Sequence, residues 1–209
     1  MMRALASVAL LASTRGWECQ WIWYVPQRGE NGSRLDAPVE MDTGTTRKAE
    51  LRAAAAITGI RNIYFLGYVD GELGAADTDE LLTKVTEVMR QVRPEVVITF
   101  GPDGITGHGD HMVISKAATG AFQKLMKPDG GSRKPYYVTI PESIVPNADE
   151  LGITTRPDDE VTTTIDIRGY LDIKVQAISA HKSQESVPEF IEMLQQGREL
   201  PLASREFLY

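Results

Sequence analysis

The sequence predicts an α/β fold: a three-layer, Rossmann-like open sheet, mostly parallel, with helices on both faces. Two observations carry this prediction. Segments with helical periodicity alternate with short apolar segments between residues 47 and 100, which is the order of right-handed βαβ units. Residues 95–100, Glu-Val-Val-Ile-Thr-Phe, have the nearly unbroken apolar character of a strand that helices cover on both faces. The length of 209 residues fits a single domain over residues 1–209.

The first elements are the hardest to assign. Residues 2–15 contain good helix formers and stop at a glycine, so we expect a helix there and a strand directly after it, at residues 21–25. One positive charge before a short apolar segment is also typical of a secretory signal. Short apolar segments look alike, and this alternative stays open, although the helix is our preferred interpretation.

The other elements follow from periodicity and turn residues. Loops are expected at residues 26–46 and 67–76, which are rich in turn formers. Thr45 or Thr46 is the expected N-cap of the first following helix, and Gly59 its left-handed C-cap. Helices are expected at residues 47–57, from 77 or 78 to 92, and at 111–126, 171–181 and 187–196, with strands at 61–66, 95–100, 136–140 and 161–165.

In open α/β sheets, ligands bind at the carboxyl ends of the strands. The loops that begin at Pro26, Gly67 and Gly101 all leave such ends. We therefore expect them to line one crevice.

The composition excludes several classes of function. The net charge is −7 with scattered positive residues, so no basic stripe is present to bind nucleic acid. No stretch approaches the ~18 apolar residues of a membrane span. Cys19 is the single cysteine, which excludes an internal disulfide framework and favours a reducing, cytoplasmic compartment.

Two of the three histidines, His108 and His111, stand three residues apart in a glycine-rich loop after the predicted central strand. At a helix start both imidazoles could face one crevice, with Asp110 as a hydrogen-bond partner. The alternative is a capping histidine beside a surface one. Two nitrogens do not complete the three ligands of a catalytic zinc. His181 is expected to be structural and to pack with Gln184.

The glycines of residues 101–107 allow a different interpretation. Followed by a helix, they could bind a phosphate through backbone N–H groups. The loop lacks the Lys-Ser/Thr ending of a P-loop, and its spacing departs from the Gly-x-Gly-x-x-Gly pattern. Nucleotide binding is therefore the last of our hypotheses.

Residues 100–104, Phe-Gly-Pro-Asp-Gly, and 107–111, Gly-His-Gly-Asp-His, resemble the second signature of the LmbE-like, or PIG-L-type, N-deacetylases. The family ending is usually Gly-His-Pro-Asp-His, so only Gly109 departs. The resemblance continues in order and spacing through residues 28–30, 47–51, 65–71, 174–177 and 181–184.

The resemblance implies a zinc site in which His111 is a metal ligand. It also implies that His108 polarises or protonates the tetrahedral intermediate, that Asp110 tunes His108, and that Arg47 helps to bind a small N-acylated amino-sugar substrate. For Arg47 the alternative is an exposed first-turn residue paired with Glu50. Such a metal would lower the pKa of water and polarise an amide carbonyl.

The early Ala-His-Pro-Asp-Asp-Glu motif of the family is absent, and no histidine precedes His108. We therefore expect that the chain begins just after this motif, without about 10 to 25 residues that form the first strand and its loop. Two ligands and the general base would be lost with them. The sheet would have an unfilled position and an apolar edge, which a homo-oligomer could cover.

Three hypotheses follow. The first is a metal-dependent amide hydrolase, an N-deacetylase of N-acetylglucosamine-type or related N-acyl conjugates, impaired in this chain. The second is a non-catalytic sugar-binding or scaffolding protein of the same fold. The third is a phosphate-binding module.

Overall fold

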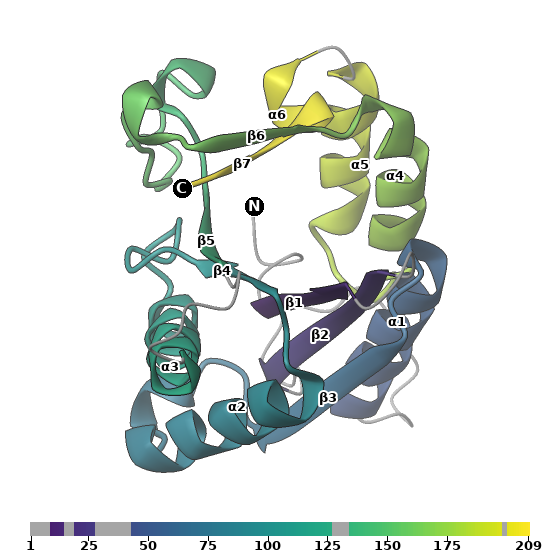
Figure 1. The fold of residues 1–209 in the computed structure, drawn as a ribbon. Helices are drawn as coiled ribbons and strands as arrows, with labels where there is room; N and C mark the ends of the chain where they lie inside the picture. The colour runs from purple at the N-terminus through teal and green to yellow at the C-terminus, as the bar shows by residue number, and fades with distance from the viewer. Residues whose placement is uncertain (1–8, 15–18, 28–42, 127–133, 198–199) are drawn as a thin grey trace.

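The computed structural model describes residues 9–14, 19–27, 43–126, 134–197 and 200–209. They form one mixed sheet of seven strands in the order β3-β2-β1-β4-β5-β7-β6 (Figure 1). The strands are β1 (Ala9–Thr14), β2 (Cys19–Gln27), β3 (Asn62–Tyr68), β4 (Val96–Phe100), β5 (Lys134–Thr139), β6 (Thr163–Asp166) and β7 (Arg205–Leu208). The helices are α1 (Thr43–Thr58), α2 (Thr78–Val92), α3 (Gly109–Leu125), α4 (Leu171–Ser179), α5 (Val187–Gln196) and α6 (Pro201–Ser204).

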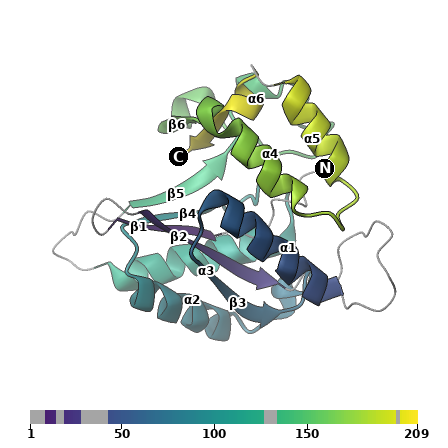
Figure 2. The same ribbon diagram turned by 90° about the vertical axis from the view of Figure 1, so that its right-hand side faces the viewer.

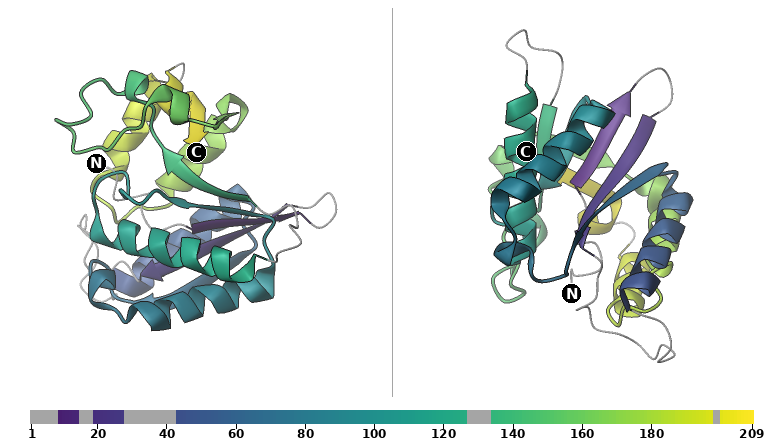
Figure 3. Two further views of the ribbon diagram at one scale, coloured as in Figure 1. Left: turned by 60° about the vertical axis from the view of Figure 1, so that its left-hand side comes forward. Right: turned by 90° about the horizontal axis from the view of Figure 1, so that it is seen from below.

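Helices cover both faces of the sheet. α2 and α3 pack side by side on one face, while α1 and α4 lie on the other (Figures 2 and 3). This arrangement confirms the predicted α/β class with helices on both faces. Among the described residues, none of the helices has the length and apolar character to cross a membrane.

The prediction of a mostly parallel sheet is wrong. β2 pairs in parallel with β3, and β4 with β5. The other four of the six strand pairings are antiparallel: β1 with β2, β1 with β4, β5 with β7, and β6 with β7. The sheet is therefore mixed.

The prediction of a helix at residues 2–15 is also wrong, because residues 9–14 form β1. The remaining residues of that range, 2–8 and 15, lie outside the described part. Only four residues separate Thr14 from Cys19, whereas a parallel neighbour needs a crossover of about a dozen residues. β1 therefore runs antiparallel to β2. It stands between β2 and β4, so the sheet position that we expected to be unfilled is occupied.

Several helix boundaries follow from local signals. Asp77 caps α2 by accepting hydrogen bonds from the backbone N–H groups of Asp79 and Glu80, as predicted. Gly59 has a φ of +77°, which confirms the left-handed cap after α1. α1 begins at Thr43, four residues before the predicted start, so Thr45 and Thr46 lie inside the helix and are not its N-cap.

The main apolar core holds α3 against the end of β4. It is built from buried side chains of α2, α3, β4 and the loops beside them, including Leu73, Leu81, Val85, Met89, Val97, Phe100 and Ile114. The buried Ser115 hydroxyl donates to the Phe100 carbonyl over 2.6 Å. The first turns of α3 are therefore fixed to the last residue of β4.

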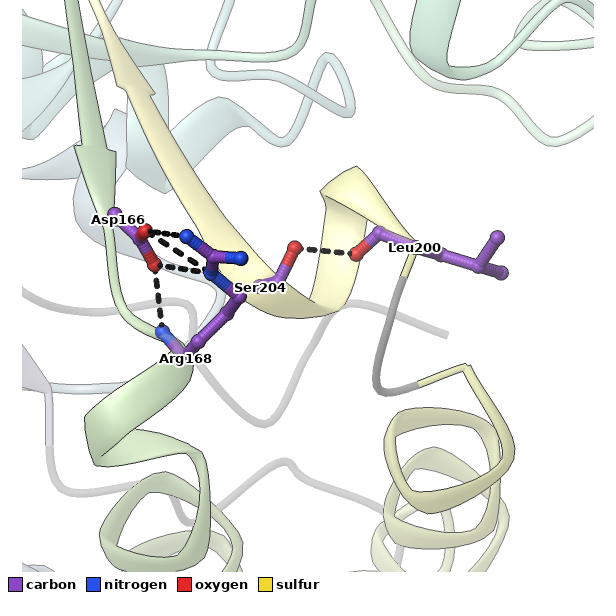
Figure 4. Close-up of polar contacts among 4 residues, drawn as sticks. All are labelled: Asp166, Arg168, Leu200 and Ser204. Atoms are coloured by element: carbon purple, nitrogen blue, oxygen red, sulfur yellow. Dashed lines mark hydrogen bonds and ion pairs between the residues drawn. The ribbon is translucent and has the colours of Figure 1, made fainter.

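α6 and β7 were not predicted, since each has only four residues. Local contacts shape this end of the molecule (Figure 4). Asp166, at the end of β6, accepts hydrogen bonds from the backbone N–H and the guanidinium of Arg168. These bonds lower the pKa of Asp166 to about 2. In α6, the Ser204 hydroxyl donates to the Leu200 carbonyl over 2.9 Å.

Candidate active site

The strand directions bring several loops to one edge of the sheet. β1 is antiparallel to both β2 and β4, so β2 and β4 point the same way, as do their parallel neighbours β3 and β5. The loops after β3 and β4 therefore leave from the same edge, as predicted. Residues 28–42, which follow β2, lie outside the described part, so their place in the crevice stays a prediction.

His111 is oriented as a metal ligand would be. Its side chain is buried, and its ring stacks on Phe100 with centroids 4.2 Å apart. Nδ1 lies 3.0 Å from the Gly104 carbonyl oxygen; a carbonyl only accepts, so Nδ1 carries the proton. This bond fixes the tautomer with Nδ1 protonated, which is the form of a neutral imidazole that binds a metal through Nε2.

His108 is the N-cap of α3, and its Nδ1 accepts a hydrogen bond from the backbone N–H of Asp110 over 3.3 Å. The neutral ring then carries its proton on Nε2. The rings of His108 and His111 lie with centroids 4.7 Å apart. The structure thus brings the two predicted histidines together, and one of them does cap a helix.

Asp110 holds the loop after β3 against the start of α3. Its carboxylate is buried and accepts hydrogen bonds from the backbone N–H groups of Gly71, at 2.7 Å, and Leu73, at 3.1 Å. It meets the His108 ring through its own backbone N–H. Tuning of His108 by the carboxylate stays a prediction.

In the loop of residues 101–107, backbone N–H groups donate hydrogen bonds to acceptors of the same loop. The backbone N–H groups of residues 104, 105, 106 and 107 donate to acceptors at residues 101, 103 and 104. Gly104, Ile105 and Gly107 have φ values of +69°, +66° and +65°. A phosphate cradle needs N–H groups that point at the ligand. Because these four are used within the loop, the geometry speaks against the phosphate-binding hypothesis.

Arg47 lies on the other side of the sheet, in α1. It is buried, with Nη1 3.7 Å from Oε2 of Glu50. The pairing with Glu50 that the alternative interpretation included is present, but the exposure that it included is not. Glu50 also accepts hydrogen bonds from the Ser183 backbone N–H at 2.6 Å and hydroxyl at 2.8 Å.

His181 packs with Gln184, as predicted, with Nδ1 3.2 Å from the Gln184 amide nitrogen. Burial lowers the pKa of His181, the Glu50 carboxylate opposes this shift, and the Arg47 guanidinium adds to it. Sequence reasoning considered Glu50 only as a partner of Arg47 and assigned no role to Ser183. No local signal marks Ser183.

The amino-terminal part of the chain, residues 3–122, matches the PIG-L family, described as GlcNAc-PI de-N-acetylase. A 1D-myo-inositol 2-acetamido-2-deoxy-alpha-D-glucopyranoside deacetylase from Rhodococcus erythropolis is 32% identical over 219 residues, covering 87% of this chain and 72% of that protein. The chain belongs to the PIG-L family. The predicted resemblance is therefore confirmed.

Two solved structures share the fold at low sequence identity. N,N'-diacetylchitobiose deacetylase from Pyrococcus horikoshii has a TM-score of 0.59 at 18% identity, covering 90% of this chain and 71% of that one. 4-Carboxy-2-hydroxymuconate hydratase from Pseudomonas putida has a TM-score of 0.61 at 21% identity, covering 90% and 82%. One is a hydrolase and the other a hydratase, so this PIG-L-like fold alone does not fix the reaction.

We tested whether the described residues fit the metal that the PIG-L resemblance implies. The orientation of His111 fits one ligand. Asp103 is engaged within its loop, where it accepts from the Ile105 N–H over 2.7 Å. Within the described ranges, no three His, Cys, Asp or Glu side chains are grouped to hold an ion. A catalytic zinc needs three protein ligands, so these residues alone do not form the centre.

Proposed function

We propose that this PIG-L family chain is an N-deacetylase of small N-acylated amino sugars or related N-acyl conjugates. The observation that carries the proposal is the His108–His111 pair, in which each ring has one nitrogen fixed by the backbone. The Rhodococcus relative, named as a deacetylase of an acetamido sugar, supports the reaction and the substrate class.

The proposed metal is zinc, with His111 as one ligand and the others from an Ala-His-Pro-Asp-Asp-Glu motif that the 209 residues do not contain. A zinc ion bound there would polarise the amide carbonyl and lower the pKa of a water molecule. The described residues contribute the orientation of His111 through the bond from Nδ1 to Gly104.

His108 is proposed to stabilise the negative oxygen by hydrogen bonding. In the tautomer set by the Asp110 N–H, its Nε2–H can donate to the oxygen that becomes negative when water adds to the carbonyl. The attacking water would give a proton to the general base of the early motif, and this proton would pass to the amine as the C–N bond breaks, which leaves a carboxylate and a free amino sugar with His108 neutral throughout. Asp110 is proposed to tune His108, and Arg47 is proposed to help bind the sugar.

We also propose that the 209-residue chain by itself is impaired, since no three His, Cys, Asp or Glu side chains are grouped to hold an ion among its described residues. The same observation favours a second candidate, a non-catalytic sugar-binding protein of this fold. A cytoplasmic location and homo-oligomer formation stay predictions.

Zinc content and acetate release test these proposals. The 209-residue chain is compared with a version preceded by a strand and the Ala-His-Pro-Asp-Asp-Glu motif, each with and without His111→Ala. We expect one zinc per extended chain and acetate release from N-acetylglucosamine conjugates on the order of 100-fold faster than the short chain, since metal sites respond to lost ligands by at least 10 to 100-fold. His111→Ala should abolish both.

Stoichiometric zinc in the short chain would disprove the impairment. If both chains bind the sugar and neither releases acetate, the deacetylase proposal is wrong and the sugar-binding protein is the better account.

A further inference from the structure

The segment between α4 and α5, residues 180–186, has no role in the proposed reaction, although part of it resembles the family sequence. It is tied to α1 by Glu50. The Glu50 carboxylate accepts one hydrogen bond from the Ser183 backbone N–H, at 2.6 Å, and one from the Ser183 hydroxyl, at 2.8 Å. These bonds join residues that are 133 positions apart in the sequence.

The cluster is buried. The exposed fractions are 9% for Arg47, 9% for Glu50 and 7% for Ser183. A buried carboxylate is costly unless hydrogen bonds or an opposite charge satisfy it. Glu50 has both, because Ser183 donates two hydrogen bonds and the Arg47 guanidinium lies 3.7 Å away. The Arg47 guanidinium therefore lies beside a carboxylate that Ser183 holds by two hydrogen bonds.

This cluster lies at the edge of the sheet from which the catalytic loops leave. α1 begins after the loop that follows β2, and Arg47 and Glu50 lie in its first half. The carboxyl ends of β2, β3 and β4 share that edge. α4 packs beside α1 (Figure 2), which places the segment that follows α4 near the same edge of the sheet.

We propose that Glu50 is a positioning residue that holds the Arg47 guanidinium and residues 181–184 together, so that this segment forms a wall of the amino-sugar site. The proposal rests on the proposed function, in which Arg47 contacts the substrate. Glu50 itself acts through Arg47 and Ser183 and not on the reacting atoms.

His181 gives a readout of the cluster that needs no turnover. It lies beside Ser183, and its pKa responds to the charges of both Glu50 and Arg47. The chain has three histidines, so an NMR titration can follow each imidazole. Loss of the Glu50 charge should lower the pKa of His181 further, because that carboxylate favours the protonated ring.

The test compares Glu50→Gln with Glu87→Gln. Glu87 forms the same kind of three-residue pair with Arg90 on α2, but both side chains are exposed. We expect Glu50→Gln to lower the pKa of His181 and to weaken N-acetylglucosamine binding about tenfold, the effect of one hydrogen bond to a charged group. Glu87→Gln should change neither.

A double-mutant cycle separates positioning from general damage. If Glu50 acts through Arg47, adding Glu50→Gln to Arg47→Gln should weaken sugar binding little beyond the single Arg47 change. Ser183→Ala is the milder variant for the case that Glu50→Gln does not fold, because it removes one of the two bonds. We expect about threefold weaker binding from it.

Two results would overturn the positioning role of Glu50 while leaving the proposed function in place. One is additive effects in the double-mutant cycle. The other is sugar binding that is unchanged in Glu50→Gln and in Ser183→Ala. Failure of the unmodified chain to bind any N-acetylated sugar would overturn the proposed function and the wall with it.

Discussion

The two sides of the candidate site are built in different ways. On the histidine side, both imidazoles form hydrogen bonds within residues 101–111: the His111 ring bonds to Gly104, seven residues away, and the His108 ring to Asp110, two residues away. On the arginine side, the decisive contact joins Glu50 to Ser183 across 133 positions. The first side is shaped by backbone conformation and the second by charge.

This difference teaches where each side is vulnerable. Left-handed glycines and backbone hydrogen bonds fix the imidazoles, so substitutions that act on the backbone should disturb them most. A buried carboxylate lies beside Arg47, so changes of charge or pH should matter there. Asp110 is the exception, since it brings a buried charge to the histidine side through Gly71 and Leu73.

The largest effect is expected for Asp110→Ala. It leaves two backbone N–H groups, those of Gly71 and Leu73, without their carboxylate in a buried place. At roughly 1.5 to 3 kcal/mol for each of the two hydrogen bonds to a charged group, we expect the free energy of unfolding to fall by about 3 to 6 kcal/mol, measured by urea denaturation.

Asp77→Ala is the matched control for Asp110→Ala. The Asp77 carboxylate also accepts two backbone N–H bonds, but at an exposed helix start. An N-cap of this kind contributes about 1 kcal/mol. Equal losses from the two substitutions would show that burial of Asp110 is unimportant and that the histidine side is held by local contacts only.

An intermediate effect is expected for Gly104→Ala. Its φ is +69°, and a Cβ there would lie 3.0 Å from the His111 Cβ and 3.3 Å from the His108 carbonyl oxygen. We expect a loss of stability of about 2 to 4 kcal/mol, from the left-handed conformation and from overpacking. The His111 imidazole signals should also shift in the NMR spectrum.

Gly107→Ala separates the two causes. Its φ is +65°, but a Cβ would meet nothing within 4 Å. Only the conformational cost of about 1 to 2 kcal/mol should remain, with little change at His111. If both variants move the His111 signals equally, the close approach of Gly104 is not what positions the ring.

Much of the fold could be predicted because its signals are local. The cap at Asp77, the end of α2 at Val92 and the bounds of α5 (Val187–Gln196) all agree with the sequence pattern. β1 was misjudged because the same apolar residues suit a helix or a strand, and its pairing with β2 and β4 has no local signal in the sequence. α6 and β7 are too short to give a periodic signal.

The candidate site also has one part with local signals and one part without them. The spacing of His108 and His111 after a buried strand indicated that they lie together, and the structure confirms it. The buried state of Arg47 and the contact of Glu50 with Ser183 depend on how α1 packs against α4. No spacing within the chain encodes that packing, so the arginine side could be predicted only through Arg47 itself.

The smallest effect is expected from pH on the arginine side. Burial holds the pKa of His181 below the ordinary value of 6.5, so the folded state favours the neutral ring. The unfolded chain therefore takes up the proton first as pH falls. The contribution of His181 to stability is complete above about pH 6.5 and is lost as pH decreases toward its lowered pKa.

The urea midpoint of the unmodified chain should therefore fall more between about pH 7.5 and pH 5.5 than that of His181→Gln, which has no group that titrates at this position. The substitution also changes the contact with Gln184, but that offset is the same at both pH values and cancels in the comparison. An equal fall in the two proteins would mean that His181 is not desolvated. The arginine side would then be as insensitive to pH as a side held by backbone alone, and the contrast between the two halves of the site would lose its electrostatic basis.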